Sequence, residues 1–91
     1  MSSHTDYFEF ATVLDVHPAD AEGRWEAALR RATPPAGIKM AVRRPTLALF
    51  TVEATTEWEA IDRVAVWLKS LADDLAPPVS LGVNAQPSSE V

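Results

Sequence analysis

The sequence predicts an α+β domain in which two helices cover one face of a four-stranded antiparallel sheet. Three stretches alternate apolar and polar residues with the period of two typical of half-buried strands, and a fourth is partly apolar on both faces. Two longer stretches repeat apolar residues at helical spacing. Their order along the chain is strand, helix, strand, strand, helix, strand. Right-handed connections then favour the ferredoxin-like βαββαβ two-layer sandwich, with strand order 4-1-3-2.

The first predicted strand covers residues 7–16, where aromatic and β-branched residues alternate with polar ones. Phe8 and Phe10 share one face of this strand, and Tyr7 and Val13 share the other. The histidine and proline that follow end the strand, because proline cannot donate a hydrogen bond to a neighbouring strand.

The first predicted helix covers residues 20–32, with Asp20 as its N-cap. One stripe of this helix carries the apolar residues Trp25, Ala28, Leu29 and Ala32. Acidic residues lie early and arginines late, as the helix dipole favours. The sequence Thr33–Gly37, with two prolines and a glycine, ends the helix.

Two strands are predicted next, over residues 38–43 and 47–54, with a tight turn at the intervening proline. Both faces of the second of these strands are partly apolar, which indicates a central position in the sheet. The longer helix begins at Thr56, which forms a capping box with Glu59. A last strand then starts at Val79 and has one polar face.

The 91 residues predict one folded domain over residues 6–85, between a flexible N-terminus (1–5) and a flexible tail (86–91). No cysteine is present, which fits a reducing, cytoplasmic compartment. Charged residues interrupt the longest apolar stretch, so no membrane span is expected. The use of alanine, arginine and proline suggests a GC-rich bacterial or phage genome.

Composition and motifs argue against several function classes. The net charge of −5 is opposite in sign to that of a typical nucleic-acid binder. His17 lies near Asp15 and Asp20, but a turn with a helix cap explains this better than a metal site, which needs three or four converging ligands. Glycine-rich phosphate loops and nucleophile elbows are missing. We therefore expect no cofactor, no metal and no catalytic residues, and enzyme activity is less expected than binding.

Acidic side chains on the uncovered face of the sheet are a further candidate for chemistry. Glu9, Asp15 and Glu53 fall on that face by alternation, and the strands of Glu9 and Glu53 should be neighbours. A solvated, solubilising sheet face is the preferred interpretation.

Three basic residues cluster on the second strand and its turn: Lys39, Arg43 and Arg44. They suit contact with an anion. Charge and proline at a sheet edge also prevent unwanted strand pairing, and we favour this second interpretation because the strand is predicted to be an edge.

The three tryptophans are expected to pack in the core. Trp25 belongs to the apolar stripe of its helix, and Trp58 lies near the start of the second stripe. Trp67 falls at the margin of that stripe, so it is the tryptophan expected to be partly exposed and to serve as an interface anchor.

The uncovered face of the sheet is the predicted working surface. Tyr7, Val13, Leu47 and Leu49 should lie there among polar residues, and an apolar patch with a polar rim marks an interaction site. The leading hypothesis is a non-catalytic protein-interaction module. Its partner would be a second copy of the chain, as a homodimer, or a different protein.

Two other functions remain open. The first is a small-molecule-binding protein or enzyme, with a pocket at the sheet face or a dimer interface lined by Tyr7, Glu9, Thr51 and Asn84. The second is an acidic inhibitor-type protein that binds a basic surface of another macromolecule, as its negative charge would favour.

Overall fold

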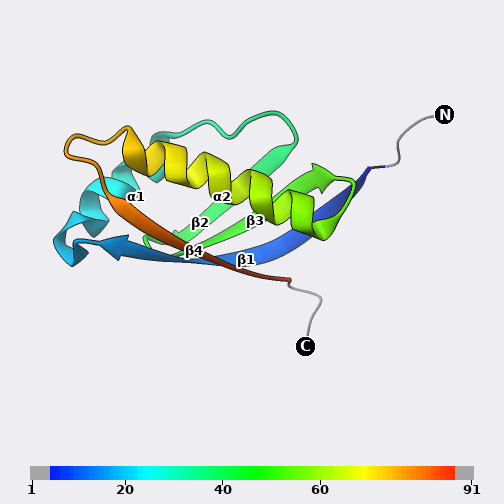
Figure 1. The fold of residues 1–91 in the computed structure, drawn as a ribbon, viewed down its shortest axis with the longest axis horizontal. Helices are drawn as coiled ribbons and strands as arrows, with labels where there is room; N and C mark the ends of the chain where they lie inside the picture. The colour runs from blue at the N-terminus through cyan, green and yellow to red at the C-terminus, as the bar shows by residue number, and fades with distance from the viewer. Residues whose placement is uncertain (1–4, 88–91) are drawn as a thin grey trace.

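The computed structural model describes residues 5–87, and the order of its elements is the predicted one (Figure 1). A short 3₁₀ helix precedes the first α-helix. The elements are β1 (Asp6–His17), the 3₁₀ helix (Ala19–Ala21), α1 (Glu22–Arg31), β2 (Ile38–Arg44), β3 (Leu47–Ala54), α2 (Glu57–Asp73) and β4 (Ser80–Pro87).

The four strands form one sheet in the order β2-β3-β1-β4, and each neighbouring pair is antiparallel. This order is the predicted one, counted from the opposite edge. β2 and β4 are therefore the edge strands, and β3 is central as its two partly apolar faces indicated. A β-bulge between Val42 and Arg44 interrupts the pairing of β2 with β3.

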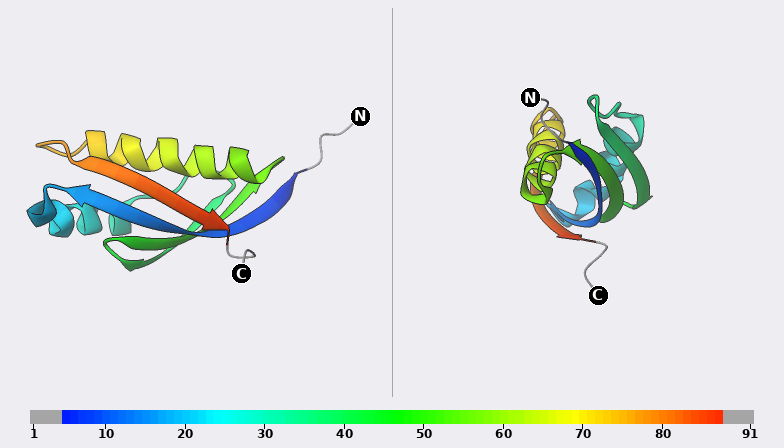
Figure 2. Two further views of the ribbon diagram at one scale, coloured as in Figure 1. Left: turned by 60° about the horizontal axis from the view of Figure 1, so that its bottom comes forward. Right: turned by 90° about the vertical axis from the view of Figure 1, so that its right-hand side faces the viewer.

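The central strand β1 is longer than either of its neighbours, and they pair with different parts of it. β3 pairs with Asp6–Val13, whereas β4 pairs with Phe10–His17. Within β1, only residues 10–13 have a strand on both sides among the described residues. The sheet is thus built in two staggered parts, and its strands fan out in the end-on view (Figure 2, right).

Both helices pack on one face of the sheet. Phe10 and Phe50 from neighbouring strands stack with their ring centroids 6.2 Å apart, and Trp67 of α2 meets Phe50 edge-on at 6.5 Å. Trp25 of α1 is fully buried in the same core cluster as Leu68 of α2. The core prediction is therefore confirmed for Trp25 and for the inward face of the strands. Within the described part of the chain, the opposite face carries no helix (Figure 2).

Local hydrogen bonds explain where α2 begins, whereas α1 starts without a side-chain cap. The hydroxyl of Thr56 accepts from the backbone N–H of Glu59 at 3.1 Å, and the Glu59 carboxylate accepts from the hydroxyl of Thr55 at 2.9 Å. The predicted cap of α2 by Thr56 is thus confirmed, but the reciprocal bond of the capping box is made with Thr55 rather than with Thr56. Asp20 does not cap α1, because it lies inside the 3₁₀ helix, after an extended Pro18.

Two side chains fasten the helices to the loops. The indole N–H of Trp25 donates to the carbonyl of Pro45 at 3.1 Å, which holds α1 against the β2–β3 turn. Arg63 of α2 donates to the carbonyls of Glu53 at 2.6 Å and Ala36 at 3.2 Å. Trp25 thus holds α1 at the turn end of the β2–β3 hairpin, and Arg63 holds α2 at the opposite end of the same hairpin.

Two further expectations differ from the structure. Trp58 is 80% exposed rather than part of the core, because it lies two residues, more than half a helical turn, from the buried Ala60. Strand β4 continues beyond the predicted domain end, and Gln86 and Pro87 pair with β1. Residues 1–4 and 88–91 of the predicted flexible ends lie outside the described residues.

Candidate interaction face

The face of the sheet opposite the helices, here called the open face, carries the outward side chains of β2, β3, β1 and β4. All four strand residues predicted for the working surface point to it: Tyr7, Val13, Leu47 and Leu49. Tyr7 is 68% exposed and Val13 is 50% exposed, whereas Leu47 and Leu49 are half-buried. The alternation of the strands is what places them there, because successive side chains point to opposite faces.

Strand register groups the apolar side chains of the open face into one patch. Ala41, Leu49 and Ala11 are direct partners across β2, β3 and β1. Leu47 and Val13 form the next row, two residues further along β3 and β1. These five side chains, here called the apolar patch, therefore lie side by side across three strands.

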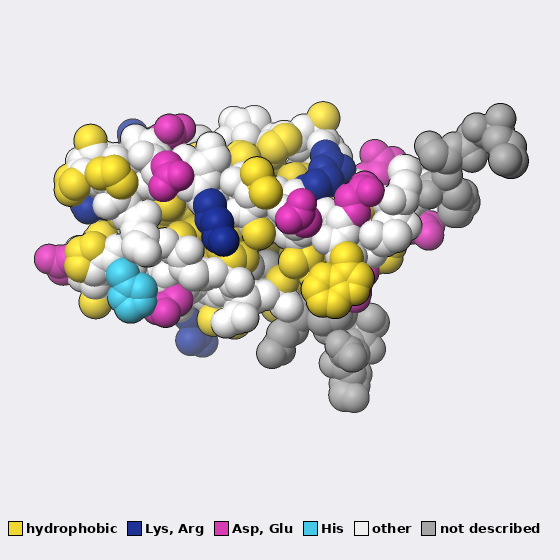
Figure 3. Space-filling model, viewed as in Figure 1, with side chains coloured by type: hydrophobic (Ala, Val, Ile, Leu, Met, Phe, Trp, Pro, Cys, Tyr) yellow, Lys and Arg dark blue, Asp and Glu magenta, His cyan; other side chains and the backbone are white. Residues whose placement is uncertain are grey.

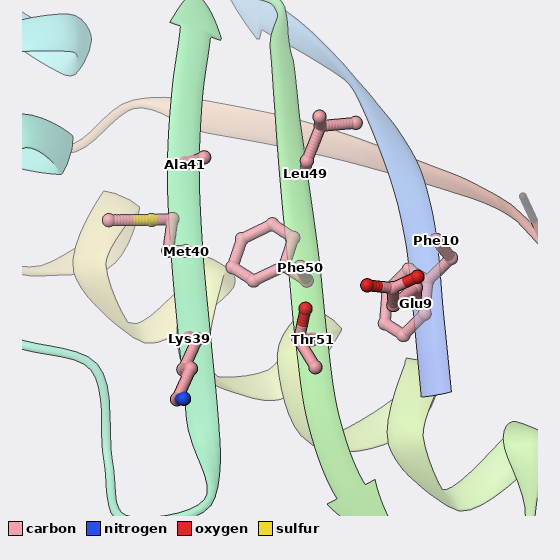
Figure 4. Close-up of a pocket in the computed structure, with 8 residues that line it drawn as sticks. All are labelled: Glu9, Phe10, Lys39, Met40, Ala41, Leu49, Phe50 and Thr51. Carbon is pink, nitrogen blue, oxygen red and sulfur yellow. The ribbon is translucent and has the colours of Figure 1, made fainter. Parts of the chain in front are cut away.

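A polar row borders the apolar patch on the side away from Leu47. Lys39, Thr51 and Glu9 are direct partners across β2, β3 and β1, so the threonine lies between a cation and an anion. Figure 4 shows the three side chains beside one another, with Leu49 and Ala41 in the adjoining row and α2 behind the sheet. The open face thus has an apolar centre and a charged border of mixed sign.

A shallow hollow of about 370 Å³ lies over these two rows. Its lining includes Glu9, Lys39 and Thr51 from the polar row and Ala41 and Leu49 from the apolar patch. Of the four residues predicted to line a pocket, Glu9 and Thr51 take part, whereas Tyr7 and Asn84 do not. The hollow offers apolar contact with few polar groups.

The three predicted anion-contact residues, Lys39, Arg43 and Arg44, are all exposed on edge strand β2. Lys39 belongs to the polar row, while the two arginines lie at the β-bulge and the turn. Their position on an edge is the predicted one. A bulge and exposed cations both make an edge strand a poor template for further pairing.

Trp67 lies on the helical side, half-buried against Phe50. It lines a second hollow of about 430 Å³ together with Ile38, Arg63 and Val66. Sequence reasoning did not single out Val66, which is 62% exposed on α2. Figure 3 shows this side of the molecule, where hydrophobic atoms are interspersed with basic and acidic side chains. The helical side therefore presents scattered apolar groups, unlike the open face.

The polar side chains near the end of β1 do not assemble a metal or catalytic site within residues 5–87. His17 Nε2 and Asp15 Oδ2 are 3.0 Å apart, and both side chains are largely exposed. No group of three histidine, aspartate or glutamate side chains converges among the described residues. Glu9 and Glu53 are on neighbouring strands as predicted, but Glu53 faces Tyr7 and Glu9 faces Thr51.

Comparison with protein-family models, with curated proteins and with solved structures finds no match to this chain. No helix among residues 5–87 is long and apolar enough to cross a membrane. The geometry of the open face is therefore the basis on which a function can be assigned.

Proposed function

We propose that this chain is a non-catalytic protein-interaction module that docks its partner through the open face. The observation that carries the proposal is the apolar patch: Ala11, Val13, Ala41, Leu47 and Leu49 adjoin one another across three strands, on a face that no helix of residues 5–87 covers. Contiguous exposed apolar surface with a polar border is typical of interaction sites.

The placement of both helices on one face of the sheet supports the same interpretation. Both helices are used on one face of the sheet, so the apolar patch has no cover within residues 5–87. Leu47 and Leu49 each keep part of their surface in water, and burial of apolar surface contributes about 25 cal/mol for each Å². A protein partner on the open face would gain this contribution from several side chains at once.

Site-specific photo-crosslinking tests the proposal. A photo-reactive amino acid replaces Ala41, in the apolar patch, and in a second variant it replaces Trp58 on the exposed side of α2. In the cells that produce the protein and in the purified protein, we expect a discrete adduct from position 41 and none from position 58. Leu49→Asp should abolish the adduct, because a carboxylate would have to be buried at the centre of the interface.

The controls separate loss of binding from loss of folding. Trp58→Asp introduces the same charge on the opposite side, so its adduct from position 41 should persist. Circular dichroism should show the same fold for both aspartate variants. A folded protein that forms no adduct at position 41, or whose adduct survives Leu49→Asp, would contradict docking through the open face.

The hollow on the open face supports a second candidate function, the binding of a small molecule. Its lining combines apolar surface with Glu9, Lys39 and Thr51, which suits a ligand that carries both charge signs. Amino acids and other small zwitterions are the simplest probes, and chemical-shift changes confined to these strands would favour this candidate. The third hypothesis, an acidic inhibitor-type protein, is less favoured because Lys39 and the two arginines of β2 lie beside the apolar patch.

The finer assignments are proposals of the same kind. The ferredoxin-like classification is supported by the element order and by the antiparallel sheet order β2-β3-β1-β4. A cytoplasmic location is supported by the lack of cysteine in a chain of this length. A bacterial or phage origin is supported only by composition.

A further inference from the structure

We infer that the partner on the open face is a second copy of this chain, related to the first by a two-fold axis that runs along β3 between the two sheets. The inference rests on the proposed function and names its partner. It is carried by the order of side chains across the sheet, which places opposite charges on either side of β3. Symmetric dimers use one surface patch twice, so this patch must be complementary to itself.

The polar row has this self-complementarity. Thr51 lies on β3, with Lys39 on one side and Glu9 on the other. A half-turn about a line along β3 exchanges the two sides and leaves β3 facing itself. Lys39 of each copy then faces Glu9 of the other, and Thr51 faces Thr51, so one row supplies two ion pairs between the copies.

The adjoining apolar row fits the same axis. Leu49 on β3 would face Leu49 of the second copy, and Ala41 would face Ala11. Stacked sheets lie about 10 Å apart, with side chains interdigitated between them. An alanine on each side of Leu49 leaves room for the two leucines to pack beside one another, and the hollow over these rows is where they would enter.

The mixed signs favour a second copy over partners of a single charge sign. A basic partner would meet Lys39, and an acidic partner would meet Glu9, each one strand away from β3. In the copy related by the two-fold axis, both charges of the polar row face their opposites, while Glu53, two residues beyond Thr51 on β3, faces its own equivalent. Like charges that face each other across an interface would oppose association.

Exchange of the two charges tests this arrangement. In Lys39→Glu, both ends of the row are acidic, and in Glu9→Lys, both are basic. Each variant alone should dimerise about tenfold more weakly than wild type, since two attractive pairs become repulsive. An equimolar mixture should form a heterodimer with affinity at least equal to wild type, and the double variant should dimerise like wild type. Sedimentation equilibrium over a concentration series measures all four.

Matched charge changes on the helical side provide the controls. Lys69→Glu and Asp73→Lys alter the net charge by the same amounts on exposed positions of α2. Both should dimerise like wild type. Thermal melts of every variant at one concentration confirm that the fold is retained.

The outcomes separate this inference from the proposed function. A monomeric wild type refutes the homodimer. The photo-crosslinking experiment then tests on its own whether another partner docks through the open face. A wild-type dimer that Leu49→Asp dissociates, but that both charge variants leave intact, overturns the two-fold axis along β3 and retains the open face. A dimer that neither Leu49→Asp nor the charge variants weaken overturns the second copy on the open face, and the photo-crosslinking experiment again decides whether the open face binds another partner.

Discussion

Thr12 offers the sharpest test of how this core is packed. It lies on the inward face of β1, is fully buried, and its hydroxyl oxygen Oγ1 has no hydrogen-bond partner among the described residues. Its direct partners across the sheet are Ala48 on β3 and Ala85 on β4, neither of which has a polar side chain. Thr12→Val replaces the hydroxyl by a methyl group of similar shape.

The expected gain can be worked from the burial of this side chain. A buried polar group without a partner costs about 1–3 kcal/mol, and a buried methyl group contributes about 0.8 kcal/mol. Valine also keeps the β-branched shape that strands favour. Because the new methyl group has to pack in the space of the hydroxyl, we expect the free energy of unfolding to rise by about 1–2 kcal/mol.

Chemical and thermal denaturation measure this change. The melting temperature should rise by about 4–8 °C for each kcal/mol in a domain of this size. Thr12→Ser, which keeps the hydroxyl and loses the methyl group, should instead lower the stability. All variants are compared at one protein concentration, since association alters apparent stability. If Thr12→Val is less stable than wild type, the hydroxyl has a partner and the reasoning is wrong.

Three further variants test local features by urea denaturation. Gly37 has φ of +85°, so Gly37→Ala should lower the free energy of unfolding by about 1–2 kcal/mol, and Gly37→Asn by less; equal losses would contradict a conformational cause. Thr56→Ala removes the cap of α2 and should cost about 1 kcal/mol, whereas an unchanged midpoint would show that the cap is dispensable. Trp58→Ala should change stability by less than about 0.5 kcal/mol, and a larger loss would place this indole in a packed environment.

Alternation and capping made most of the fold predictable. Phe10 and Phe50 point inward and Val13 and Leu49 outward because a strand turns successive side chains to opposite faces. The start of α2 was predictable because a threonine and a glutamate three residues later satisfy backbone groups locally. These signals depend on short stretches of sequence, which is why they can be read without the fold.

The misplaced features depend on more than local pattern. Asp20 is a good capping residue by type, but the chain forms a 3₁₀ helix there, and the aspartate lies within it. Trp58 is large and apolar, yet the buried side of α2 is set by Ala60 and Val64, which leave it outside. In both cases the residue type suggested a role, capping for Asp20 and burial for Trp58. The position of each residue within its helix determined the role that it actually has.

The candidate site was predictable only as a face. Alternation shows that Glu9, Lys39 and Thr51 point to the same side, but which of them are neighbours depends on two strand registers. Those registers are set by pairing across the sheet and by the bulge near Val42, for which the sequence carries no local signal. The row of opposite charges became visible only in three dimensions.

The staggered pairing of β1 has a consequence for how the domain opens. Within β1, only residues 10–13 have strands on both sides among the described residues, so their amides should be the last of β1 to exchange with solvent deuterium. On either side, residues 6–9 pair with β3 alone and residues 14–17 pair with β4 alone, although the Leu14 N–H also donates to the carbonyl of Thr46 at 2.8 Å. The part of β1 that pairs only with β3 can thus open locally while the part that pairs only with β4 stays hydrogen-bonded, and the reverse is also possible. Residues 10–13 connect these two independently opening parts.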